Sequence, residues 1–152
     1  MSKEWTRSSI YNFDIEFNRI ETYNKYIKSC YGNFFPTTTS IKELLYSVVI
    51  KNDYTIEDIP DLQDYCRIKN NLNILCEVNQ ITEIEKLPLN YTNPYEYFNY
   101  QKANELEARL RANLDVIGNR QYSSNICGLL SCGQTMSNIN GNMEQMKIIL
   151  NN

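Results

Sequence analysis

The apolar residues of this chain recur at the spacing of an α-helix, and this periodicity limits the possible fold more than any other feature of the sequence. From Phe13 to Tyr31 they fall three, four or seven positions apart, which places them on one face of a helix expected over residues 14–31. Gly32 follows and is predicted to end that helix. A second apolar face predicts a helix over residues 60–79, with Pro60 at its first helical position.

A third long helix and a shorter one are expected from capping signals as well as periodicity. Asn93 can cap the third helix, which is expected to stop at Gly118. The shorter helix is expected from Ser40, because Ser40 and Glu43 have the spacing of a capping box. The β-branched residues at 48–50 leave a strand as the alternative for the end of this segment.

The sequence after Gly118 has a different character. Residues 120–133 lack helical periodicity and contain two glycines, which favours an extended or hairpin-like segment, and a short helix is expected over 142–150. The sequence therefore predicts a mainly α fold, a small helical bundle of three long helices plus one short helix, with a short extended or hairpin element near the C-terminus. We divide it into a helical bundle domain at 1–118 and a C-terminal segment at 119–152, which is expected to make subunit contacts.

Charged residues near the helices indicate local structural roles. The acids around the start of the second long helix are Glu57, Asp58, Asp61 and Asp64. Acids are favoured there by the helix dipole, so capping and solvation are expected rather than acid–base catalysis. Two pairs on the third helix are spaced four apart, Glu105 with Arg109 and Glu107 with Arg111. Such pairs predict an exposed, mildly stabilising face.

The residue inventory argues against most enzymatic chemistry. The chain has no histidine, the commonest general base and metal ligand, and its five glycines do not form a phosphate-binding loop. Its net charge is -3, and its basic residues are dispersed among acids, which does not suit nucleic acid. No apolar run reaches the roughly 20 residues that span a bilayer. We therefore expect a non-enzymatic protein, folded in a cytosol, with no cofactor, no nucleic-acid partner and no membrane insertion.

The cysteines leave one alternative open. There are five, an odd number, so a complete disulfide framework is impossible and a reducing compartment is expected. Cys127 and Cys132 could contribute to a metal site or a cryptic catalytic site. Their spacing matches no common pair of zinc ligands, and cysteine often packs as a small hydrophobic residue, so no metal is expected.

The aromatic content points to contacts with a partner. Twelve tyrosines supply large amphipathic contact area, and the rings gathered at 91–100 exceed what one helix face can bury. A low-GC genome that enriches tyrosine is the alternative explanation. The candidate interface residues are Tyr95, Phe98, Tyr122, Ile126, Leu129, Leu130, Met143, Met146 and Ile149.

A series of short motifs resembles small proteins and N-terminal domains encoded among the tail genes of phages and prophages of low-GC Gram-positive bacteria. The motifs are, in order, Trp5, YNFD at 11–14, FNRIE at 17–21, DIP at 58–60, RIKNN at 67–71, LP at 87–88, ANELE at 103–107 and SCG at 131–133. The resemblance spans roughly residues 5 to 134, and the order of the motifs is more specific than any one of them.

The resemblance implies a structural component of a phage tail or tail-like particle, at the baseplate, tail tip or fibre attachment. It implies a scaffold or adaptor with no enzymatic activity, whose partners are other virion structural proteins and further copies of itself in a symmetric assembly. Such a protein is made in the bacterial cytoplasm and then becomes part of the virion tail. The rival interpretation is a small regulatory or inhibitory protein-binding module, which would act in a one-to-one complex.

Overall fold

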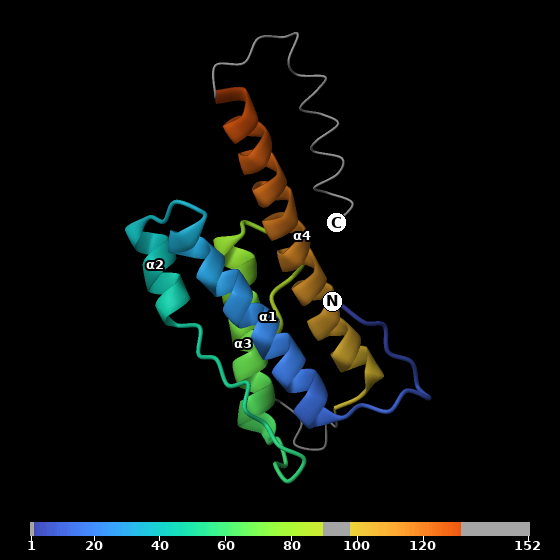
Figure 1. Ribbon diagram of the computed structural model, residues 1–152. Helices are drawn as coiled ribbons and strands as arrows, with labels where there is room; N and C mark the ends of the chain where they lie inside the picture. Colours follow the sequence, from blue (N-terminus) through green and yellow to red (C-terminus); the bar gives the residue numbers. More distant parts are fainter. Residues whose placement is uncertain (1, 90–97, 132–152) are drawn as a thin grey trace. The chain divides into compact units, whose positions relative to one another are not determined.

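The protein is mainly helical, as the apolar periodicity predicts. The computed structural model describes residues 2–89 and 98–131, with side chains up to 121, and it contains the helices α1 (Phe13–Asn33), α2 (Thr39–Tyr46), α3 (Leu62–Val78) and α4 (Tyr100–Ser131) (Figure 1). No strand occurs in this part of the chain. None of the helices described is long and apolar enough to cross a membrane. The chain divides into two compact units, Met1–Ile117 and Gly118–Asn152, so the boundary falls within α4.

Helix α1 confirms the helix predicted over residues 14–31. Its first turn carries Asp14 and Glu16, which the helix dipole favours. Its helical backbone is interrupted near its end, at Tyr31 and Gly32, where Gly32 takes a left-handed φ of 91°, a conformation that favours glycine. The N–H groups of Phe34 and Phe35 then donate to the carbonyl of Cys30, at 2.9 and 3.1 Å. This satisfies a carbonyl that the helix end would otherwise leave unpaired.

The short helix α2 is confirmed, but its predicted cap is wrong. Thr38 is the capping residue, and its hydroxyl accepts a hydrogen bond from the N–H of Ile41 at 3.2 Å. Ser40 lies inside the helix instead, because the extended backbone at Thr38 already places a hydroxyl over the first turn. Helix α2 ends at Tyr46, and the β-branched residues at 48–50 form neither helix nor strand.

Helix α3 begins with a capping box made of two aspartates. Asp61 accepts from the N–H of Asp64 at 2.9 Å, while Asp64 accepts from the N–H of Asp61 at 3.0 Å. The capping role predicted for the acids near this helix start is therefore confirmed for these two. Pro60 precedes the cap, so its predicted place at the first helical position is wrong. The reciprocal aspartates satisfy two N–H groups and so place the cap at Asp61, directly after the proline, and the first helical residue at Leu62.

Helix α4 does not end at Gly118 as predicted. It runs from Tyr100, where the side chain of Asn99 accepts from the N–H of Lys102 at 3.0 Å, to Ser131. Unlike Gly32, Gly118 does not take a left-handed φ, and a helical glycine costs only about 1 kcal/mol relative to alanine. The predicted start at Asn93 and the residues after Ser131, including the rest of the predicted hairpin, lie outside the described residues.

The core of Met1–Ile117 is formed by α1, α3 and the first part of α4. These three segments lie side by side in Figure 1, and α2 packs on α3. The fully buried apolar side chains at their centre are Phe17, Ile20, Ile27, Ile68, Leu72, Leu75, Leu106, Leu110 and Ile117. They come from the apolar faces that the periodicity predicted, so burial of these faces drives the packing of the helices.

Four asparagines on the helices hold the non-helical segments in place. Each uses its side-chain carbonyl to accept from a backbone N–H and its side-chain NH₂ to donate to the carbonyl of the same residue, at distances between 2.7 and 3.0 Å. The pairs are Asn18 with Tyr54, Asn71 with Val49, Asn73 with Leu87 and Asn104 with Trp5. We call these the asparagine clamps. They give the backbone of connecting segments the partners that a neighbouring strand would provide.

Removing one clamp should destabilise the protein more than removing an exposed amide. Asn73→Ala leaves the N–H and carbonyl of Leu87 without their partner in a buried place. Each such group costs about 1–3 kcal/mol, so the free energy of unfolding should fall by about 2 kcal/mol or more in urea denaturation. The control is Asn52→Ala, at an exposed position, which should change it by less than about 0.5 kcal/mol. Equal stability of the two variants would contradict the role of the clamp.

Candidate functional site

The most strongly charged part of the interior joins the N-terminal segment to α1 and α4. The carboxylates of Glu16 and Glu107 are almost completely buried, with 5% and 2% of their side chains exposed. Arg19 pairs with both, through a 2.8 Å contact from Nε to Glu16 and a contact from its terminal nitrogen to Glu107. Lys3 adds its ammonium group to Glu16 at 2.6 Å and its backbone N–H to Glu107 at 2.9 Å.

This charge network corrects one expectation from the sequence. Glu107 was predicted to pair with Arg111 on an exposed face of its helix, but it is buried and pairs with Arg19. Arg111 donates to the hydroxyl of Ser2 instead, at 2.9 Å. The spacing of four residues could not reveal this, because the partner of Glu107 comes from another helix. The network thus holds the N-terminal segment, α1 and α4 together. Each of the two acids is already bound by cations and N–H groups of the protein.

Aromatic rings surround this network. Phe98 packs against Tyr11, Phe13 and Tyr65, with ring centroids 4.9 to 5.2 Å apart. Phe98, Tyr11 and Phe13, together with Trp5 and others, line a cavity of about 400 Å³. Burial, followed by the nearby charges of Glu107 and Glu16, raises the pKa of Tyr11 far above its usual value. Tyr11 therefore contributes ring surface here and stays protonated at ordinary pH.

A third buried acid, Glu21, binds the segment that follows α2. Its carboxylate accepts from the backbone N–H of Lys51 at 3.2 Å and from the side chain of Asn71 at 3.1 Å. Burial raises the pKa of Glu21, and these hydrogen bonds only partly oppose that effect. Asn71 also clamps Val49, so α1, α3 and the residues after α2 meet at one polar centre.

The cysteines whose side chains the structure describes are free thiols. Cys30 and Cys76 are buried, Cys66 is partly exposed, and burial raises the pKa of Cys30 and Cys76. Cys76 accepts a hydrogen bond from the side chain of Asn113 at 3.2 Å. Among the described side chains, no three potential ligands gather around a common point. The side chains of Cys127 and Cys132, on which the metal alternative depends, lie outside that set.

Among the candidate interface residues predicted from the sequence, Phe98 is the one whose side chain the structure describes. Phe98 is half-buried and packs within the aromatic cluster of its own chain. The side chains of the others are outside the described part of the chain, so their predicted contacts stay predictions. Those residues are Tyr95, Tyr122, Ile126, Leu129, Leu130, Met143, Met146 and Ile149.

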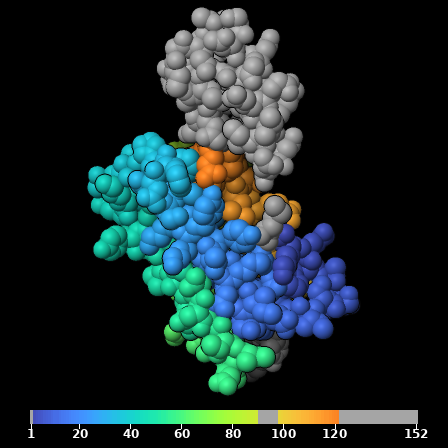
Figure 2. Space-filling model, viewed as in Figure 1, coloured from blue at the N-terminus to red at the C-terminus, as the bar shows by residue number. Residues whose placement is uncertain are grey.

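A surface that the sequence did not indicate lies on α2 and the connection to α3. Five large apolar side chains there are between 51% and 92% exposed, and we call this surface the α2–α3 edge. They are Tyr46, Val49, Ile56, Ile59 and Leu62. In Figure 2 this part of the chain, coloured cyan to green, forms one side of the molecular surface. Isolated isoleucines among acids, outside any helical period, were the only signal in the sequence.

Removal of the arginine at the centre of the charge network should be strongly destabilising. Arg19→Met leaves Glu107 and Glu16 buried with fewer cations, and breaking a buried pair costs about 3–5 kcal/mol of unfolding free energy. The matched control is Lys86→Met, which breaks an exposed pair with Glu77 and should cost at most about 1 kcal/mol. Chemical denaturation of both variants measures the difference. A loss as small for Arg19→Met as for the control would show that the network contributes little.

The buried Glu21 predicts a specific pH dependence of stability. Because its pKa is raised in the folded protein above the ordinary 4.5, its contribution to stability is fully present below that pH and is lost as pH rises through the folded pKa. Relative to the non-titrating variant Glu21→Gln, the wild type should therefore lose unfolding free energy between acidic and neutral pH.

The opposite slope is expected for Asp64, which provides the control. Burial alone would raise its pKa, but hydrogen bonds from Arg67 and Tyr54 lower the pKa of Asp64 to about 2. Its contribution is present above the ordinary 3.8 and is lost as pH falls toward 2. Urea denaturation should be measured from about pH 2 to neutral pH for the wild type and for each variant. The difference between wild type and Glu21→Gln should fall as pH rises above 4.5, and the difference between wild type and Asp64→Asn should rise between about pH 2 and 3.8. Slopes of the same sign would contradict the assignment.

Comparison with known proteins adds no relative: no family model, no curated protein and no solved structure matches this chain.

Proposed function

We propose that this chain is a structural, non-catalytic subunit of a phage tail or tail-like particle, where it acts as a scaffold or adaptor by packing against other subunits. The observation that carries the proposal is the α2–α3 edge, where five large apolar side chains between residues 46 and 62 are exposed. Single exposed apolar residues are ordinary, but several large ones along one short segment are typical of a site that binds another protein.

The interior supports the same role. The buried acids Glu16, Glu21 and Glu107 are each bound by cations or N–H groups of the protein itself. The asparagine clamps then hold the connecting segments against the helices. A subunit that is fixed in this way loses little conformational entropy on assembly, which favours binding through preformed surfaces.

The kind of particle is proposed from the order of the sequence motifs. Several of them contain residues with a structural role: FNRIE at 17–21 includes Glu21, RIKNN at 67–71 includes Asn71, and ANELE at 103–107 includes Glu107. The motifs on which we base the resemblance to phage tail proteins thus include residues that hold this fold together. We take their order along the chain as the basis for proposing a tail component.

The proposal is tested on particles. Tail-like particles purified from the bacterium that encodes this chain should contain it, in a copy number that matches their symmetry, because a scaffold subunit repeats with the assembly. Quantitative mass spectrometry gives the copy number, and labelling of a tagged chain in electron micrographs gives its position. A host protein of similar abundance serves as the control for carry-over. Absence from the particles, with recovery in a one-to-one complex elsewhere, would contradict the proposal and favour a regulatory binding module.

A further inference from the structure

The α2–α3 edge carries opposite charges at its two ends. One end, which we call the basic end, comprises Tyr46 and Val49 with three lysines nearby and a single acid, so that bases predominate; these are Lys25, Lys28, Lys42 and Glu43. The other, the acidic end, comprises Ile56, Ile59 and Leu62 with Glu57, Asp58 and Asp61. Among the residues described, the ion pairs do not involve Lys25, Lys42 or Glu57, and all three are exposed. These charges are therefore available to a partner.

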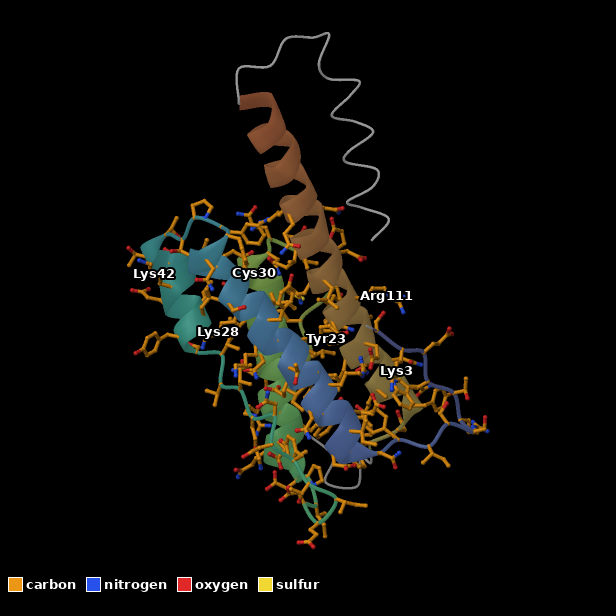
Figure 3. The ribbon with its side chains drawn as sticks, viewed as in Figure 1. Lys3, Tyr23, Lys28, Cys30, Lys42 and Arg111 are labelled. Atoms are coloured by element: carbon orange, nitrogen blue, oxygen red, sulfur yellow. The ribbon has the colours of Figure 1, made fainter. Side chains whose placement is uncertain are left out.

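The lysines of the basic end are placed by the register of α1. Glu21, Lys25 and Lys28 follow one another at intervals of four and three residues, so they share a face of the helix. Glu21 binds the N–H of Lys51, and Lys28 donates to the carbonyl of Val48 at 3.1 Å. Lys25 therefore lies along the segment that contains Val49. Figure 3 shows Lys28 and Lys42 on the side of the molecule where α2 lies.

The acidic end is a loop with a fixed shape. Asp58 accepts from the N–H and the hydroxyl of Thr55, at 2.6 and 3.0 Å, and Asp61 caps α3. Between these anchors, Ile56 and Ile59 are 89% and 92% exposed. The loop is thus held in place while its largest apolar side chains face the solvent. This costs hydrophobic free energy unless a partner covers them.

We propose that the α2–α3 edge is a self-association surface, on which two copies of this chain pack antiparallel about a two-fold axis. In a two-fold interface the same patch meets itself in reverse. The basic end of one copy then lies on the acidic end of the other, and the apolar side chains of both are covered. A parallel arrangement would bring like charges together, so charge sets the direction of packing. The inference rests on the proposed function, because it names the contact by which one packing subunit joins another.

The association is tested on the full-length chain by sedimentation equilibrium over a wide range of protein concentration. We expect a monomer–dimer equilibrium with no larger species, because a two-fold contact closes on itself. Ile59→Ser should raise the dissociation constant about tenfold or more, since the side chain is buried once in each copy. The matched control is Ile10→Ser, also highly exposed (82%) but on the N-terminal segment, which should leave the dissociation constant unchanged.

Charge reversal tests the antiparallel direction. Glu57→Lys and Lys25→Glu should each weaken the dimer, because each places like charges opposite one another. The double variant, which exchanges the two charges, should regain at least part of the lost affinity. High salt should weaken the wild-type dimer for the same reason. Circular dichroism confirms that each variant is folded, which is expected because both positions are exposed.

Three results would overturn the proposal: a monomer at every concentration, a dimer unaffected by Ile59→Ser, or an open-ended series of oligomers. If the chain is a monomer at every concentration, the partner that covers the α2–α3 edge is a different protein. Failure here is distinguishable from failure of the proposed function, because the copy number in purified particles is measured separately. A chain that is present in particles but monomeric in solution would refute only the self-association.

Discussion

The connecting segments of a helical bundle need partners for their backbone, and this constraint shapes the protein. Outside the helices, a buried N–H or carbonyl has no intrahelical partner, and leaving it unpaired is costly. Here the helices supply partners through asparagine side chains, each of which binds one residue of a connecting segment through both its N–H and its carbonyl. Asn104 fixes the N-terminal segment at Trp5, Asn18 and Asn71 fix the connection after α2, and Asn73 fixes the segment before α4.

The buried charges depend on those clamps and act at the same junctions. Once Asn104 holds Trp5, the backbone and the ammonium group of Lys3 can reach Glu107 and Glu16. Arg19 then neutralises the same two acids from α1. An ion pair removed from water stabilises a fold only when its remaining hydrogen bonds are also made. The N-terminal segment supplies several of these bonds, so the packing of α1 on the first part of α4 includes it as a structural element.

The sequence predicted the helices well and the polar contacts poorly, for the same physical reason. Helical periodicity is local, so α1, α2 and α3 were recognised from the spacing of apolar residues such as Phe17 and Leu72. Contacts between elements are not local: Glu107 has a cation four residues away in sequence, yet it binds Arg19, which lies 88 positions earlier. The asparagines were equally hidden, because a residue common in loops gave no sign that it would work from within a helix. The helix end predicted at Gly118 was wrong because glycine permits a left-handed turn without requiring one.

The α2–α3 edge is the point at which the fold and the proposed contact depend on the same residues. Asn18 and Asn71 fix the backbone at Tyr54 and Val49, respectively. Asp58 and Asp61 fix the loop that leads from Tyr54 to the start of α3. The two aspartates shape the loop and also give the acidic end its charge, while the isoleucines beside them add nothing to the core. A residue that is exposed, apolar and held by a fixed backbone has no stabilising role in the isolated chain. Its contribution must come from what covers it, and a second copy offers the complementary charge in the arrangement that this surface requires.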